Sequence, residues 1–244
     1  MLTAVTLTLK GKEEKRHSHS LGSVLQGFLM EQLDTGYARR MHQMQLHPYS
    51  QSLRVVGKQL VWKVNTLTYE AGVEMIGKIK DLKEISLRHR GEVLQVEKVD
   101  LESISYGDLF ESFYFQEQSF HIRFRFLTPA SFKRQGQYML YPTVRLIFQS
   151  LITKFNSFSS EIQLQKEDFL RDLEGYAKLE GYKMESTFFS LEGANIPAFR
   201  GEIQYKIQGP QPMANLVHML GKFGTFSGVG IKNGMGMGAL AILP

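Results

Sequence analysis

The sequence predicts an α+β fold made of two tandem βαββαβ units. Three observations support this fold class. The first half of the chain has the pattern β-α-β-β-α-β, the second half repeats that order, and a C-terminal glycine-rich loop separates the last helix from the last strand. At 244 residues the chain is long enough for one large domain or for two small domains with separate cores.

The first unit is defined by strands of alternating polarity and by helices with an apolar stripe. Residues 2–10 alternate strictly, and residues 21–33 carry an apolar face formed by Leu21, Val24, Leu25, Phe28 and Leu29. The expected elements are strand 2–10, helix 21–33, strands 51–56 and 59–68 joined near Gly57, helix 69–80, and strands 84–90 and 92–105. This order is the ferredoxin-like arrangement.

The second unit repeats the order after a break at Tyr106-Gly-Asp, so we expect domains at 1–112 and 113–244. Its first strand alternates phenylalanine and isoleucine with His121, Arg123 and Arg125, and Pro142 fits the first turn of the helix that follows. The expected elements are strand 120–127, helix 142–155, strands 185–191 and 198–207, helix 212–223 and strand 238–243.

Composition excludes several classes of protein. The chain has no cysteine, which rules out disulfides and thiolate metal sites and agrees with a reducing compartment. Its apolar runs are shorter than the roughly 18 residues that a membrane span requires. The first ten residues alternate like a strand and lack the basic region of a signal peptide. We therefore expect a cytoplasmic protein with no membrane partner.

Charge is segregated along the chain. Segments 1–60, 118–160 and 193–244 carry net charges of +4, +6 and +3, whereas 69–117 and 161–192 carry −5 and −4. A folded protein with one basic face would show this pattern and would bind a polyanion with salt-dependent affinity. Chance segregation over solvated surfaces is the alternative interpretation.

The glycine-rich loop has the spacing G-x-G-x5-G-x-G. It comprises Gly228, Gly230, Lys232, Asn233, Gly234, Gly236 and Gly238. Glycines permit positive φ and close approach to a ligand, and successive free N–H groups in such a turn would bind phosphate with help from Lys232. No glycine here is followed by Lys-Ser/Thr, and the loop precedes the last strand, so the common nucleotide-binding motifs are excluded. A simple tight turn is the alternative.

Histidines are the candidate catalytic groups. Four of the seven, His17, His19, His42 and His47, occur within 31 residues, and His42 and His47 are expected just after the first helix. Zinc binding is disfavoured because no cysteine or suitable carboxylate completes a ligand set. Histidine with Arg39 and Arg40 nearby suits general acid–base work on a phosphodiester. Solvated loop histidines are the alternative.

Four regions together resemble the CRISPR-associated endoribonucleases that process precursor CRISPR RNA, the repeat-cleaving members of the RAMP superfamily. The regions are Leu25–Phe28; Met41-His42 with Pro48–Ser52; Phe126–Lys133 with Gly136, Pro142 and Ile147–Leu151; and the loop Gly228–Gly238. They span nearly the whole chain, so the resemblance is more specific than any single glycine pattern.

This resemblance implies two tandem ferredoxin-like (RRM-related) domains. It also implies cleavage within the CRISPR repeat without metal or cofactor, by attack of a 2′-hydroxyl that yields a 2′,3′-cyclic phosphate and a 5′-hydroxyl. His42 takes the family's general acid–base position, while His47 and Met30 stand where the family often has an assisting lysine and tyrosine. A methionine cannot transfer a proton, so we expect His42 and His47 to share this work.

The expected RNA-binding residues are Arg39, Arg40, Lys133, Arg134, Gly228, Gly230, Lys232, Asn233, Gly234, Gly236 and Gly238. CRISPR repeat RNA, as precursor and as mature guide RNA, is the expected partner; effector-complex subunits and a second copy of the chain are further candidates. A non-catalytic RNA-binding subunit of a CRISPR effector complex is the main alternative. A small-molecule-binding ferredoxin-like protein is a third interpretation, which the charge segregation disfavours.

Overall fold

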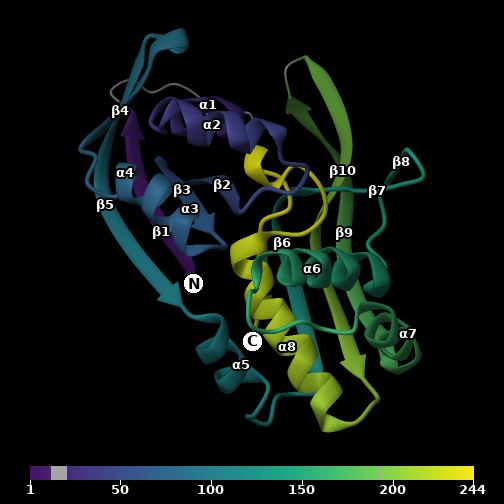
Figure 1. Ribbon diagram of the computed structural model, residues 1–244. Coiled ribbons are helices and arrows are strands. Elements are labelled where there is room, and N and C mark those ends of the chain that lie inside the picture. The colour runs from purple at the N-terminus through teal and green to yellow at the C-terminus, as the bar shows by residue number, and fades with distance from the viewer. Residues whose placement is uncertain (12–20, 192) are drawn as a thin grey trace.

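The computed structural model describes residues 1–11, 21–191 and 193–244. These residues form two units, each an antiparallel sheet with packed helices (Figure 1). The predicted α+β fold with two tandem ferredoxin-like domains is confirmed, because both sheets have the strand order that βαββαβ connectivity produces.

The first unit holds a five-stranded sheet in the order β2-β3-β1-β5-β4, with every neighbouring pair antiparallel. Its elements are β1 (Leu2–Gly11), α1 (Leu21–Glu31), α2 (Thr35–Gln43), β2 (Tyr49–Val56), β3 (Gln59–Thr66), α3 (Tyr69–Ala71), the π-helical turn η1 (Gly72–Ile76), α4 (Gly77–Ile79), β4 (Glu84–Leu87), the 3₁₀ turn η2 (Arg88–Arg90) and β5 (Glu92–Ile104). Strand β1 lies between β3 and β5 in this sheet.

The second unit repeats this order, with a four-stranded sheet β11-β6-β10-β9. Its elements are α5 (Tyr106–Phe113), β6 (His121–Ala130), β7 (Phe132–Arg134), β8 (Gln137–Met139), α6 (Val144–Phe158), α7 (Lys166–Tyr176), β9 (Ala177–Leu191), β10 (Ala194–Ile207), α8 (Gln211–Ser227), the 3₁₀ turn η3 (Asn233–Met235) and β11 (Leu240–Leu243). The glycine-rich loop joins α8 to β11, as expected.

Several elements differ from the sequence prediction. Helices α2, α5 and α7 and the β7–β8 hairpin were not expected, β9 begins at Ala177 rather than 185, and β4 stops at Leu87. Helix α2 buries only Tyr37 and Met41, too few apolar residues to produce a clear stripe. The first half of β9 is mostly exposed on both faces, so its residues do not alternate.

Side-chain caps explain where the helices begin. Thr143 accepts a hydrogen bond from the Leu146 N–H (3.2 Å) and so caps α6, which leaves Pro142 just before the helix instead of in its first turn. Ser105 caps α5 in the same way through the Asp108 N–H (2.9 Å).

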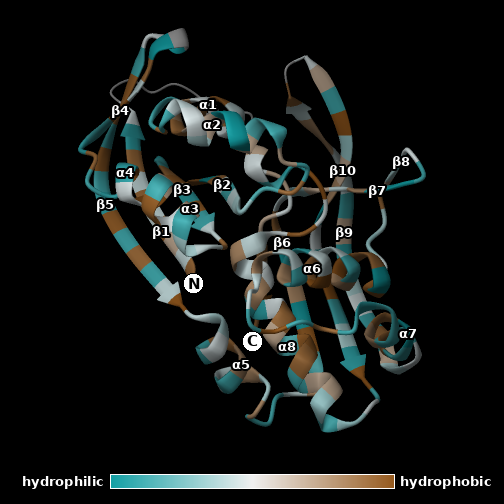
Figure 2. Cartoon of the chain, viewed as in Figure 1, coloured by the Kyte–Doolittle hydropathy of each residue, from teal (hydrophilic) through white to brown (hydrophobic). Residues whose placement is uncertain are grey.

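The hydrophobic core of the second unit extends across the boundary into the first unit. It unites the buried faces of β6, α6 and α8 with Leu2, Ala4 and Leu67 of the first unit and with Tyr106 and Leu109 of α5. Hydrophobic residues gather along α8 and the neighbouring strand β6 (Figure 2). A separate cluster lies beneath α1 and α2 of the first unit. The units therefore share packed surface in addition to a linker.

No helix within residues 1–11, 21–191 and 193–244 is long and apolar enough to cross a membrane.

Candidate functional site

His42 lies in the last turn of α2. Asp34 begins this helix by accepting a hydrogen bond from the Gly36 N–H (2.8 Å), and Tyr37 and Met41 bury one face. The side chain of His42 is exposed on the other side. The sequence placed His42 just after the first helix, and the structure has it there, on the short helix α2 that the sequence did not predict. His17 and His19 lie outside the described residues.

His47 lies in the turn between α2 and β2 and is half-buried. Its ring stacks on Tyr49, with 5.5 Å between centroids and 20° between planes. Burial lowers the pKa of His47, and the positive charges of His42 and Lys232 lower that pKa further. Hydrogen bonds to backbone groups of the α2 end oppose this shift without cancelling it. His47 is therefore neutral at pH 7 and able to accept a proton.

The glycine-rich loop reaches the first unit next to these histidines. Figure 1 shows the yellow segment that follows α8 lying close to α2 and β2. Gln51 of β2 donates to the Gly234 carbonyl (2.9 Å) and to the Gly22 carbonyl (2.7 Å). Gly234 lies against the Tyr49 hydroxyl, where a Cβ would come within 3.0 Å of that oxygen. The turn that follows Lys232 therefore packs against Tyr49, on which His47 stacks, although the two segments lie nearly two hundred residues apart in sequence.

The loop's N–H groups are largely engaged within the protein. Val229, Gly230 and Ile231 donate to the Gly238 carbonyl (2.8 Å), the Ser150 hydroxyl (2.8 Å) and the Ser131 carbonyl (3.0 Å). The Gly238 N–H donates to the Pro129 carbonyl (2.9 Å). The prediction of free N–H groups is wrong at these four positions, because the loop folds back on strand β6 and helix α6.

Close backbone packing explains the glycines. Gly230 and Gly238 have φ of 73° and 70°, and a Cβ on either would overlap a carbonyl oxygen of Ser131 or Val229. Among the predicted RNA-binding residues of the loop, the buried ones are Gly228, Asn233, Gly234, Gly236 and Gly238. Lys232, in the left-handed conformation with φ of 57°, is exposed.

A buried lysine of α6 holds the loop in this shape. Lys154 donates to the Gly228 carbonyl (2.9 Å) and to the side-chain oxygen of Asn233. The Asn233 amide donates in turn to the Val229 and Met237 carbonyls (2.9 Å each), which ties the two limbs of the loop together. Burial lowers the pKa of Lys154 to about 7.

A groove of about 580 Å³ runs between the β7–β8 hairpin and α6. Its lining includes Lys133, Arg134 and Arg145, together with Gly230 of the loop and Leu46, the neighbour of His47. The groove is therefore mainly basic, and its lining includes the residue that precedes His47. Of the predicted RNA-binding residues, Lys133, Arg134 and Gly230 meet here.

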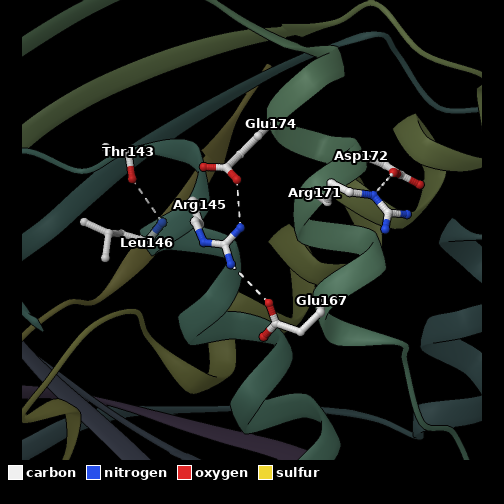
Figure 3. A network of polar contacts seen from close by, with 7 residues as sticks. All are labelled: Thr143, Arg145, Leu146, Glu167, Arg171, Asp172 and Glu174. Carbon is white, nitrogen blue, oxygen red and sulfur yellow. Dashed lines mark hydrogen bonds and ion pairs between the residues drawn. The ribbon is translucent and has the colours of Figure 1, made fainter.

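Arg145 is oriented by two carboxylates of α7. Its guanidinium donates to Glu174 (2.7 Å) and to Glu167 (3.1 Å), as Figure 3 shows. These bonds fix a planar donor group at the groove wall and attach α7 to α6.

The two arginines of α2 differ. Arg40 donates to Glu70 (2.6 Å) and lies over the Tyr37 ring at 5.0 Å. Within the part of the chain that the structure describes, no ion pair engages Arg39, which is exposed. Arg39 is thus the better candidate for a phosphate contact.

Sequence reasoning missed Lys154, Arg145, Gln51 and the stacking role of Tyr49. A signal for Lys154 was available, because it lies three residues after Leu151 and seven after Ile147, on the apolar face of its helix. A lysine in such a stripe is seldom buried unless its ammonium group has partners. The described residues contain no cluster of three or more His, Cys, Asp or Glu that could hold a metal ion.

The fold defines a protein with two tandem ferredoxin-like domains that share a core and join a histidine pair to a glycine-rich loop. The family model "CRISPR-associated endoribonuclease Cas6" matches residues 124–240. A curated relative of that name from Streptococcus thermophilus is 35% identical over 216 residues, which cover 88% of each chain. Another, from Mycobacterium tuberculosis, is 33% identical over 250 residues, covering 100% of this chain and 79% of the relative. The chain belongs to the CRISPR-associated endoribonuclease Cas6 family.

The solved structures agree at the level of the fold. A structure described as a Cas6 product complex superimposes with a TM-score of 0.84 at 21% identity, covering 100% of this chain and 99% of the other.

Proposed function

We propose that the protein is an endoribonuclease that cuts precursor CRISPR RNA within its repeats and so generates mature guide RNAs. The 2′-hydroxyl before the cut attacks the adjacent phosphate, without a metal ion, and leaves a 2′,3′-cyclic phosphate and a 5′-hydroxyl. The observation that carries this proposal is the packing of the glycine-rich loop, through Gly234, against Tyr49, on which His47 stacks, beside a groove lined by Lys133 and Arg134. Membership of the Cas6 family supports it.

The two histidines divide the proton transfers. Neutral His47 takes the proton of the 2′-hydroxyl as the O2′–P bond forms, and its lowered pKa suits it to act as the base. Protonated His42 gives a proton to the 5′-oxygen as the P–O5′ bond breaks. His42 is exposed at the C-terminal end of α2, where its ring is accessible to the RNA.

Cations bind the reacting phosphate and the strand that leads to it. Lys232 neutralises charge on the non-bridging oxygens near His47, and Arg39 assists from α2. Lys133, Arg134 and Arg145 bind the RNA backbone in the groove. Lack of cysteine agrees with a reducing, cytoplasmic setting.

The decisive experiment incubates the protein with repeat RNA in EDTA. Specific cleavage with a cyclic phosphate end supports the proposal, whereas RNA that is bound tightly and left uncut supports the non-catalytic RNA-binding subunit. A 2′-deoxy nucleotide at the cut must abolish cleavage, because the attacking group is missing.

Single-turnover rates test the residues. His42→Ala and His47→Ala should each slow cleavage about 10²- to 10⁴-fold with RNA affinity preserved. His121→Ala is the matched control, because His121 is an exposed histidine on β6, away from the α2 turn, and should leave the rate unchanged. Unchanged rates for both site variants would contradict the assignment.

A further inference from the structure

Lys154 is a buried cation whose hydrogen bonds all lead to the glycine-rich loop. Its side chain extends from α6 beneath the loop, where 5% of the residue is exposed. The ammonium group contacts the carbonyl oxygens of Ser227 (3.5 Å) and Gly228 (2.9 Å) and the side-chain oxygen of Asn233. A lysine has three donors, and these three acceptors lie at the end of α8 and in the loop that follows it.

These acceptors are neutral. Within the described residues, no carboxylate pairs with Lys154. Its donors are therefore occupied by the protein, which leaves none for an RNA phosphate even though the residue lies beside the groove. A buried charge without a counter-ion is costly, so its position indicates a role in shaping the loop.

The contacts continue from Asn233 to the histidines. Asn233 begins the turn η3, which follows directly on Lys232. The next residue of that turn, Gly234, packs against Tyr49 and accepts a hydrogen bond from Gln51. Tyr49 stacks on His47. A single path of packed groups therefore joins Lys154 to the turn that follows Lys232 and, through Tyr49, to His47.

We propose that Lys154 is a positioning residue: through Asn233 it fixes the turn Lys232–Gly236 against Tyr49 and so sets the charge of Lys232 beside His42 and His47. Lys154 does not touch the RNA. This inference rests on the proposed function, in which Lys232 acts on the reacting phosphate. Removal of Lys154 should displace Lys232 by a small distance, and a misplacement of about 1 Å can cost about 10²-fold in rate.

A double-mutant cycle of single-turnover cleavage tests this path. Lys154→Met and Lys232→Met should each slow cleavage about 10- to 100-fold. The double variant should be no slower than the slower single variant, since Lys154 acts only through Lys232. Affinity for an uncleavable 2′-deoxy repeat should change less than about threefold on Lys154→Met, because one phosphate contact at most is disturbed. A double variant whose loss of rate equals the product of the two single losses would overturn the proposal.

A second measurement does not depend on activity. The pKa of His47, followed by NMR, should rise in Lys232→Met because the neighbouring cation is lost, and it should rise by a smaller amount in Lys154→Met, where that cation is displaced. Asn233→Ala, which keeps Lys154 but removes its side-chain acceptor, should give the same rise. An unchanged His47 pKa in both Lys154→Met and Asn233→Ala would refute the path.

Two controls separate the possible failures. Lys78→Met removes an exposed lysine of α4 and should leave both the rate and the His47 pKa unchanged. If His42→Ala retains full cleavage, the proposed function fails, yet the effect of Lys154 on the His47 pKa would stand. If His42→Ala is inactive while Lys154→Met is fully active, only the positioning role fails.

Discussion

At the scale of single residues, the proposed site depends on a histidine whose pKa is lowered by its surroundings. His47 is half-buried against Tyr49, and two nearby cations oppose its protonation. A general base works best when its pKa lies near the working pH. Neutral His47 and exposed His42 thus differ in environment although both lie within six residues of sequence.

The pH profile of cleavage should reflect this arrangement. The rate should rise with pH as His47 loses its proton, with an apparent pKa below the usual 6.5 of histidine. Lys232→Met removes a cation that favours neutral His47, so the rise of the rate should move to higher pH. Single-turnover rates between about pH 4.5 and 8 check the shift. An unchanged apparent pKa in Lys232→Met would contradict the influence of Lys232 on His47.

Tyr37 offers a test of stability that is independent of the chemistry. Its hydroxyl is buried and has no hydrogen-bond partner among the described residues, and burial raises its pKa to about 12. Tyr37→Phe removes an unsatisfied polar group and keeps the ring, so the free energy of unfolding should rise by up to about 1 kcal/mol. Chemical denaturation measures the change; a loss of more than about 1 kcal/mol would reveal a hidden partner.

The sequence identified candidate residues of the proposed site but not the residues that surround them in the folded protein. His42, His47 and Lys232 stand out as titratable residues in unusual settings. Their meeting depends on contacts across the two units, such as Gln51 with Gly234, which no local pattern encodes. Lys154 looked like one more basic residue, because burial of its ammonium is decided by tertiary packing.

At the scale of elements, the glycine-rich loop is a rigid, hydrogen-bonded structure. Its glycines allow two backbone limbs to approach each other and β6 more closely than any side chain would permit. Most of its polar backbone is satisfied internally, so it presents Lys232 instead of a row of N–H groups. Its position between helix and strand followed from periodicity, whereas its internal bonding could not, since glycine spacing does not specify hydrogen-bond partners.

Gly238→Ala should be severely disruptive. The new Cβ would overlap the Val229 carbonyl at a residue with φ of 70°, and we expect a loss of about 2–4 kcal/mol in the free energy of unfolding, together with slower cleavage. Gly27→Ala is the control: it lies within α1, where nothing lies within 4 Å of the new Cβ. It should stabilise the protein by about 0.5–1 kcal/mol. Equal effects in the two variants would be inconsistent with this packing.

The contact of α6 with the loop should also make stability depend on pH. Lys154 has a pKa of about 7 in the folded protein and its ordinary, higher pKa when unfolded, so the unfolded chain binds more protons above pH 7. Stability should therefore rise from pH 7 to 10 through this group, by roughly 1 kcal/mol per pH unit. Lys154→Met should show a flatter profile over that range. If the free energy of unfolding rises equally with pH in the two proteins, Lys154 does not have the lowered pKa of a buried lysine.

Short polar helices explain most of the missed elements. α2 and α7 each lie on the surface and bury two or three apolar residues, so no stripe of apolar residues marks them. The strongly alternating β1 and β6 were recovered within one or two residues at their starts, because one face of each is buried and the other is more open.

At the scale of the whole molecule, the two ferredoxin-like units are mutually dependent. The core of the second contains Leu2, Ala4 and Leu67 from the first, and α5 packs its Leu109 into the same cluster. Ser50 of β2 donates to the Phe226 carbonyl at the end of α8. The repeated topology was visible in the order of sequence patterns, but this shared core was not, because the sequence does not show which surfaces of two similar units face each other.

A fragment of residues 113–244 should therefore fold poorly by itself. It lacks five apolar side chains of its own core cluster, Leu2, Ala4, Leu67, Tyr106 and Leu109. Each of the four larger side chains contributes about 2–5 kcal/mol, comparable in sum to the stability of a domain. Calorimetry of the full chain should show one cooperative transition, and circular dichroism of the fragment should show loss of native structure. A stable fragment with native thermal behaviour would contradict the shared core.

The Gln51 amide has a consequence for the timing of activity. It joins the start of α1, the strand β2 and the turn η3, and its oxygen accepts from Trp62 at 2.6 Å. The ribosome makes the histidines early, but the loop that brings Lys232 to them emerges about two hundred residues later. Under the proposed mechanism, a nascent or truncated chain would carry the two histidines without Lys232. We therefore expect efficient cleavage of RNA only after the glycine-rich loop has been made and has packed on β2.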